Sequence, residues 1–153
     1  MSFISKMPNA ELKLRVLDSS DMEDLYQWRN HPFIRRKCFN SRPLSRKEHE
    51  RWFKRKSQSR DTTIYIGHCQ GQKIGMVRFD KNGSDRIKVS VMVSPDFIGR
   101  NLGSKLIQSG VRKIMKTQSG KIVIAEIKQS NIASIKAFKK AGFKMSHLIY
   151  TFE

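Results

Sequence analysis

One segment limits what this chain can fold into more than any other: a β-rich run leads through a glycine-containing loop into an amphipathic helix. The run covers residues 87–93, and Pro95 ends it. Gly99 and Gly103 follow, and the helix expected over 102–116 carries apolar side chains on one face. Backbone N–H groups in such a loop and in the first helical turn have no intrahelical partner and point toward an anion. The segment therefore predicts a site for phosphate groups.

The alternative is an ordinary strand–loop–helix connection, because short motifs often match by chance. The loop lacks both the Gly-Lys-Ser/Thr of a P-loop and the GxGxxG of a dinucleotide site. It resembles the acetyl-CoA loop of the GNAT acetyltransferase superfamily, whose pattern is Gln/Arg-x-x-Gly-x-Gly/Ala. In that register Gly103 keeps the second glycine, whereas Ile98 replaces Gln/Arg and Asn101 replaces the first glycine. Asn tolerates a left-handed backbone better than most residues, so we expect the turn to form.

A second segment strengthens the resemblance. A strand expected over 122–128 is followed by Asn131, Ser134, Phe138 and Gly142-Phe143. GNAT enzymes have a similar order: Asn, a small residue or Ser three positions on, an aromatic residue, then Gly-Phe. With both segments, the chain is identified as a GNAT superfamily member, which implies acetyl-CoA as cosubstrate and no metal. The resemblance implies that acetyl-CoA is bound by Val91, Met92, Val93, Ile98, Gly99, Arg100, Asn101, Leu102, Gly103, Ser104, Asn131, Ser134 and Phe138.

The order of the expected elements agrees with that family. Asn82-Gly83 predicts a hairpin, and the capping box from Ser45 to Glu48 fixes the start of a helix. The expected strands are 12–17, 62–69, 73–80, 87–93, 122–128 and 144–152, and the expected helices are 21–30, 45–58, 102–116 and 132–141. We therefore expect one α/β domain over residues 1–153 with the GNAT fold: a mixed central sheet of six to seven strands and about four helices.

Composition excludes several classes of protein. No apolar stretch is long enough to span a membrane, and the N-terminus lacks the apolar core of a signal peptide. Cys38 and Cys69 are the only cysteines, and neither stands at metal-ligand spacing with a histidine. We therefore expect a cytoplasmic protein with reduced thiols, without a zinc site, that is a monomer or a homodimer.

The charge is strongly positive, at +18. Residues 29–60 hold twelve basic and two acidic side chains, a local net charge of +10. Such a segment attracts polyanions, including nucleotide phosphates, RNA and acidic protein. The alternative is that these side chains only solvate helix faces. For the cluster as a whole we favour an anionic ligand.

The candidate for the catalytic base is Glu126. Only Asp96 and Glu153 are also acidic from residue 86 onward, and Glu126 is expected in the middle of an apolar strand. A carboxylate there is costly unless it is paired or functional. It also precedes Asn131 by five positions, where the resembling ribosomal-protein N-terminal acetyltransferases hold a proposed general base. The alternative is an ion pair with Lys88.

Two further roles follow from the resemblance. The superfamily often uses a Tyr to protonate the departing thiolate, and Phe138 stands in its place. Water, Tyr150, Ser134 or His147 could donate instead, or the sulfur could leave as the thiolate. The oxyanion would be held by backbone N–H groups near residues 91–93, where the fourth strand separates from the fifth.

The substrate end is expected in the segment from Trp28 to Phe53. His49, Trp52 and Phe53 share one helix face, and core packing is the simple explanation for the aromatic pair. The order of residues nevertheless resembles GNAT enzymes that acetylate nucleotide-linked amino sugars, among them the pseudaminic acid biosynthesis type, which acetylates the 4-amino group of a UDP-linked sugar. The implied substrate-binding residues are Arg29, Asn30, Arg35, Phe39, Asn40, His49 and Trp52.

We therefore expect an acetyl-CoA-dependent N-acetyltransferase that acts on a UDP-linked amino sugar, with no membrane partner. Two alternatives stay open. One is a protein or peptide N-terminal acetyltransferase. The other is a catalytically silent GNAT domain that binds RNA or acidic protein. We favour a small-molecule substrate over a nucleic-acid partner.

Overall fold

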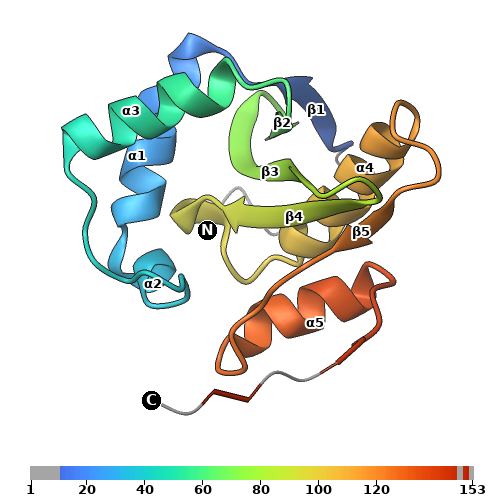
Figure 1. Ribbon diagram of the computed structural model, residues 1–153. Helices are drawn as coiled ribbons and strands as arrows, with labels where there is room; N and C mark the ends of the chain where they lie inside the picture. The colour runs from blue at the N-terminus through green and yellow to red at the C-terminus, as the bar shows by residue number, and fades with distance from the viewer. Residues whose placement is uncertain (1–10, 148–149, 152–153) are drawn as a thin grey trace.

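The computed structural model describes residues 11–147 and 150–151, which form a five-stranded sheet with helices on both faces (Figure 1). The strands are β1 (Lys13–Val16), β2 (Thr62–Cys69), β3 (Gln72–Asn82), β4 (Arg86–Val93) and β5 (Ile122–Ile124). They lie in the order β1-β2-β3-β4-β5. The first three pairings are antiparallel, and β4 pairs with β5 in parallel. The expected α/β fold with a mixed sheet is confirmed.

In the described part of the chain, five α-helices accompany the sheet, together with the short 3₁₀ helices η1 (Ser19–Asp21) and η2 (Pro95–Phe97). The α-helices are α1 (Met22–Asn30), α2 (Pro32–Arg35), α3 (Arg46–Ser57), α4 (Leu102–Met115) and α5 (Ile132–Lys140). The predicted capping box of α3 is present, since Ser45 and Glu48 exchange side-chain and backbone hydrogen bonds. The unexpected helix is α2, in which Pro32 stands in the first turn and the His31 ring accepts from the Phe33 N–H.

Side chains along β2 alternate between the two faces of the sheet, and each face packs into a separate layer of the core. Ile64 and Ile66 face α1 and α3, where they meet Leu25 and Phe53, whereas Tyr65 faces the layer that contains α4. Figure 1 shows α1 and α3 on one side of the sheet and α4 on the other. The helix α4 approaches closely because Gly110 has no side chain: a Cβ there would lie 2.7 Å from a Val77 methyl carbon.

Two expectations about the sheet are wrong. The sheet has five strands among the described residues, not six to seven, because residues 144–147 and 150–151 are not in a strand. The rest of the strand expected over 144–152 (residues 148–149 and 152) lies outside the described residues. The strand expected over 122–128 ends at Ile124, where its pairing with β4 also ends.

The early end of β5 opens the sheet. The last parallel pair joins Lys88 to Ile124, yet β4 continues for five more residues to Val93, paired only with β3. The chain after Ile124 instead leads to α5, which packs against α4. The expected separation of the fourth strand from the fifth is therefore confirmed, and it creates the site described below. Within the described residues, no helix is both long and apolar enough to cross a bilayer.

Candidate active site

A cavity of about 600 Å³ occupies the opening between β4, α5 and the α1–α2 region. Its lining comes from segments far apart in the sequence, which is typical of a ligand site. The lining residues are Arg29, Phe33, Ile34, Lys37, Cys38, Phe39, Met76, Arg78, Ser90, Val91, Met92, Val93, Phe97, Ile98, Gly99, Asn101, Leu102, Gly103, Ser104, Asn131, Ala133, Ser134, Lys136, Ala137 and Lys140.

The loop before α4 has the backbone that the sequence predicts. Gly99 has a φ of 82°, and Asn101 has a φ of 57° as the N-cap of α4. The Ser104 hydroxyl donates to the Asn101 carbonyl at 3.1 Å, which ties the first turn of α4 to the loop. All predicted acetyl-CoA residues of this loop line the cavity except Arg100, whose guanidinium lies 5.1 Å from the centre of the Phe97 ring.

Gly103 lies where three elements meet. A Cβ at this position would lie 3.5 Å from the Ala137 Cβ of α5 and 3.7 Å from a Val93 methyl carbon of β4. Those are ordinary contact distances, so the protein itself has room for a methyl group there. A larger side chain would extend into the cavity or against α5.

The start of α5 forms the opposite wall. The Asn131 side chain accepts a hydrogen bond from the Ser134 N–H at 3.2 Å and so caps the helix. Both residues line the cavity, as the sequence predicts. Phe138 does not: it is 5% exposed and meets Phe143 edge to face, with 5.1 Å between the ring centres. Phe138 therefore packs in the core, and its contact with acetyl-CoA stays a prediction.

Of the side chains considered as proton donors to the thiolate, one lines the cavity and two do not. Ser134 lines the cavity, whereas Tyr150 is 88% exposed and His147 is also exposed, with neither in the cavity lining. Ser134 is therefore the member of that set that lies at the site.

The predicted substrate residues separate into lining and supporting residues. Arg29 and Phe39 line the cavity, and Phe39 is 69% exposed. The Nη2 of Arg29 donates to the Asn40 carbonyl at 2.6 Å, while its Nη1 is buried without a partner in the described chain. A guanidinium held in this way keeps hydrogen-bonding capacity for a ligand.

Asn30, Arg35 and Asn40, which the sequence predicts to bind substrate, do not line the cavity. Asn30 exchanges two hydrogen bonds with the Leu44 backbone, at 2.8 and 2.9 Å. Arg35 donates to the carbonyls of Asn30 and Ser41, at 3.0 and 3.3 Å. The Asn40 side chain accepts from the Arg42 N–H. These polar groups hold the loop between α2 and α3, and so support the part of it that lines the cavity.

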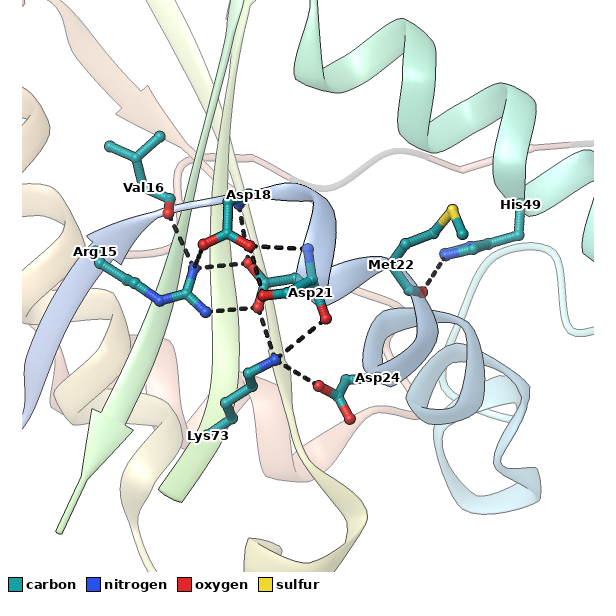
Figure 2. Close-up of polar contacts among 9 residues, drawn as sticks. Arg15, Val16, Asp18, Asp21, Met22, Asp24, His49 and Lys73 are labelled. Atoms are coloured by element: carbon teal, nitrogen blue, oxygen red, sulfur yellow. Dashed lines mark hydrogen bonds and ion pairs between the residues drawn. The ribbon is translucent and has the colours of Figure 1, made fainter. Parts of the chain in front are cut away.

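His49 and Trp52 also lie outside the cavity lining. His49 is 3% exposed, and its Nε2 lies 2.9 Å from the Met22 carbonyl, a contact that joins α3 to the start of α1 (Figure 2). Burial lowers the pKa of the His49 ring, so the neutral form is favoured. Trp52 stacks on His49 with 5.5 Å between the ring centres. The helix-face pattern of these residues reflects packing, which is the simple explanation noted above.

Glu126 is not where the sequence predicts it. Since β5 ends at Ile124, Glu126 follows the strand instead of lying in its middle, and its side chain is 60% exposed. Its Oε2 lies 3.2 Å from Nζ of Lys88, the ion pair named as the alternative. Glu126 is not part of the cavity lining. Its role as a base stays a prediction, and the geometry favours the ion pair.

Several cavity residues were missed, above all cations. Lys37, Arg78, Lys136 and Lys140 join Arg29, so five basic side chains and no acidic side chain line the cavity among the described residues. Three of the α5 contributors, Ala133, Lys136 and Lys140, follow helical spacing, so periodicity could have found them. Burial, followed by the charge of Arg36, lowers the pKa of the Lys37 amine. Within the described residues no group of three or more His, Cys, Asp or Glu side chains could hold a metal ion.

Comparison with known proteins agrees with this geometry. The family described as Acetyltransferase (GNAT) domain matches residues 11–144. The uncharacterized protein MJ1062 of Methanocaldococcus jannaschii is 27% identical over 139 residues, which is 89% of this chain but only 28% of that protein's length. A crystal structure of a domain from Methanocaldococcus jannaschii superimposes with a TM-score of 0.79 and 26% identity, over 90% of this chain and 91% of that one.

Two complexes with the cosubstrate or its product share the fold at lower identity. Spermidine N-acetyltransferase from Vibrio cholerae, with CoA and spermine, has a TM-score of 0.79 and 17% identity, over 93% of this chain and 86% of that one. The N-acetyltransferase PseH from Campylobacter jejuni, with acetyl coenzyme A, has a TM-score of 0.68 and 18% identity, over 91% and 92% of the two chains. The family match covers most of the chain and agrees with the cavity at the open edge of β4, so this chain belongs to the GNAT acetyltransferase family.

Proposed function

We propose that this chain transfers the acetyl group of acetyl-CoA to the 4-amino group of a UDP-linked amino sugar. The observation that carries the proposal is the charge of the cavity, which has five basic and no acidic lining residues in the described chain. A nucleotide-linked sugar brings a diphosphate that such a lining attracts. The resemblance of residues 28–53 to enzymes that acetylate nucleotide-linked amino sugars agrees with this choice.

The same charge argues against polyamine acceptors. Arg29, Lys37 and Arg78 line the cavity in the region of α1, α2 and β3. Two like unit charges about 4 Å apart repel by about 4 kcal/mol at an effective dielectric constant of about 20. Without a lining carboxylate to offset it, that repulsion disfavours a polycation. The likeness to the spermidine enzyme is therefore a likeness of fold.

The cosubstrate fits the region formed by β4, α4 and α5. Lys136 and Lys140 on α5, with the backbone of residues 98–104, would hold its phosphates. Beyond Lys88, β4 has no neighbouring strand on its β5 side among the described residues, so backbone groups there are available to a ligand. When bound, acetyl-CoA supplies the thioester that an amine attacks. The N–H groups near residues 91–93 would stabilise the charge that develops on its carbonyl oxygen.

The side chains that line the cavity also indicate how the acceptor amine loses its proton. Neither a carboxylate nor an imidazole lines the described cavity. Basic surroundings disfavour an ammonium ion, so the acceptor reacts as the free amine after its proton is released to solvent. Amino acceptors with a pKa near neutrality suit such a site better than those with a high pKa.

A thiol-release assay tests the proposal. Acetyl-CoA would be offered with a UDP-linked 4-amino sugar, spermidine, an aminoglycoside and peptides with free N-termini. We expect the highest kcat/KM with the UDP-linked sugar. Efficient turnover of peptides with no activity on the UDP-linked sugar would reject the substrate assignment in favour of an N-terminal acetyltransferase. Salt-sensitive RNA binding without any turnover would favour the silent domain.

A further inference from the structure

Arg78 is the cavity cation that lies on the sheet itself. It is in β3 directly opposite Ser90 of β4, between Val77 and Phe79, which are both buried in the core. Alternation along β3 places Arg78 on the face covered by α1 and α3, together with Met76. A guanidinium at this position is carried by the central strand of the sheet.

Three neighbours hold the Arg78 side chain. Its Nε lies 2.7 Å from Oδ2 of Asp80, and its Nη2 donates to the Ser90 hydroxyl at 3.3 Å. The guanidinium carbon lies 5.7 Å from the centre of the Trp52 ring. Nη1 makes no hydrogen bond within the described chain, and Arg78 lines the cavity. The side chain is therefore oriented by its neighbours while one end of its fork stays available.

Asp80 is the residue that sets this orientation. It does not line the cavity, and its side chain is 16% exposed. Its Oδ1 lies 2.6 Å from Nζ of Lys56 on α3 and accepts from the Thr62 hydroxyl at 2.8 Å. Burial alone would raise the pKa of Asp80, but the Lys56 hydrogen bond and the Arg78 charge outweigh it and lower that pKa. The carboxylate is thus ionised, and its contact with Nε orients the Arg78 guanidinium.

The charges of this group do not cancel. Asp80 carries one negative charge between the positive charges of Lys56 and Arg78, which leaves an excess of one positive charge next to the cavity. Arg29 and Lys37 also line the cavity and add positive charge, and no lining carboxylate opposes them in the described residues. An anion completes such an arrangement.

We propose that Arg78 binds a phosphate group of the acceptor and that Asp80 is its positioning residue. The inference rests on the proposed function, because it identifies the residue that recognises the phosphorylated part of that acceptor. A phosphate on Arg78 places the rest of the acceptor in the same cavity as the open edge of β4. Arg78 thereby selects acceptors that carry a phosphate.

Four variants and three acceptors test the proposal. The variants are Arg78→Met, Arg78→Lys, Asp80→Asn and the matched control Lys81→Met, which removes an exposed cation of the same strand outside the cavity. The acceptors are a UDP-linked amino sugar, an amino sugar 1-phosphate and the free amino sugar. Melting temperature and the stabilisation by acetyl-CoA show whether each variant is folded.

For Arg78→Met we expect KM for the two phosphorylated acceptors to rise roughly 10- to 100-fold, since a charge-assisted pair is lost. KM for the free sugar and for acetyl-CoA should change less than about twofold. For Asp80→Asn we expect a smaller rise, roughly 3- to 10-fold, with kcat unchanged. Arg78→Lys should restore part of the loss, because it keeps the charge without the fork. Lys81→Met should match the wild type.

Calorimetry with UDP alone tests the inference without turnover. We expect wild-type protein to bind UDP and Arg78→Met to bind it at least 10-fold more weakly. Equal losses for free and phosphorylated acceptors, or UDP binding that does not depend on Arg78, would overturn the inference. Arg78-dependent UDP binding without acetyl transfer to any UDP-linked sugar would support the inference and reject the proposed function.

Discussion

Two groups of charged residues in this protein differ in how their charges are paired. In the first, Asp21 is 1% exposed and is bound by Arg15 through two contacts of 2.7 Å and by Lys73 at 2.9 Å (Figure 2). In the second, the cavity cations have no lining carboxylate among the described residues. The first group satisfies its charges within the chain, and the second leaves hydrogen-bonding capacity for something else.

The difference follows from what each group connects. The Asp21 group joins β1, the turn before α1 and the start of β3, and the Asp18 N–H also donates to Asp21. Those elements must be fixed for the first layer of the core to form. The cavity lies where β4 and β5 separate, and no carboxylate lines it among the described residues. A buried charge that the chain itself pairs supports the fold, whereas a lining charge without a partner indicates a ligand.

The largest expected effect is a loss of stability when the charges around Asp21 are no longer paired. Asp21→Asn should lower the free energy of unfolding by about 3–5 kcal/mol, because it leaves two cations without their buried partner. Urea titration followed by circular dichroism measures this. Asp24→Asn is the control, since Asp24 contacts Lys73 but is 42% exposed, and its expected cost is at most about 1 kcal/mol. Similar stability of the two variants would remove the distinction drawn between the groups.

The next largest expected effect is on the stabilisation of the protein by acetyl-CoA bound in the cavity. Gly103→Val should abolish the stabilisation by acetyl-CoA, which is about 2.7 kcal/mol at a ligand concentration 100-fold above Kd. The branched side chain would fill space beside Val93 and Ala137 that the ligand needs. Gly103→Ala, which the neighbouring distances allow, should fold normally and keep part of the shift. A folded Gly103→Val protein with the full shift would contradict the location of the acetyl-CoA site.

Local features of the fold and of the cavity could be predicted from the sequence, and non-local ones could not. The left-handed Asn101 and the capping box of α3 depend on residues within a few positions, and both are confirmed. The end of β5 depends on where β4 stops pairing with it, which its own apolar run does not show. His49 shares a helix face with two aromatic residues, a pattern that is the same for core packing and for a pocket. Arg78 alternates with core residues in β3, so only the packed sheet places it at the cavity.

The third effect is the pH dependence of the paired group. Burial would raise the pKa of Asp21, but hydrogen bonds from Arg15, the Asp18 backbone and Lys73 outweigh it and lower the pKa from 3.8 to about 2. A pKa lowered by folding stabilises the protein above the unfolded value and loses that contribution as pH falls toward the folded value. About 2 kcal/mol should therefore be lost between pH 5 and pH 2.

Denaturant titrations across that pH range, at constant ionic strength, measure the loss. The Asp21→Asn protein is the comparison, because it has no carboxyl to titrate at this position and should show a flatter dependence. Parallel curves for the two proteins would mean that other carboxyl groups cause the acid sensitivity.

The smallest expected effect belongs to Glu126, whose ion pair with Lys88 resembles neither group. The pair joins a side chain 60% exposed to one 36% exposed, so solvent screens it, and it is expected to contribute about 0–1 kcal/mol to stability. Glu126→Gln keeps the shape of the side chain and removes its basicity. We expect kcat to change by less than about twofold across pH 6–9, because the carboxylate lies outside the cavity lining. Lys88→Met serves as the control, since it breaks the same pair without touching the carboxylate. A loss of about 100-fold or more in Glu126→Gln alone would instead show that Glu126 reaches the acceptor amine as a general base, directly or through water.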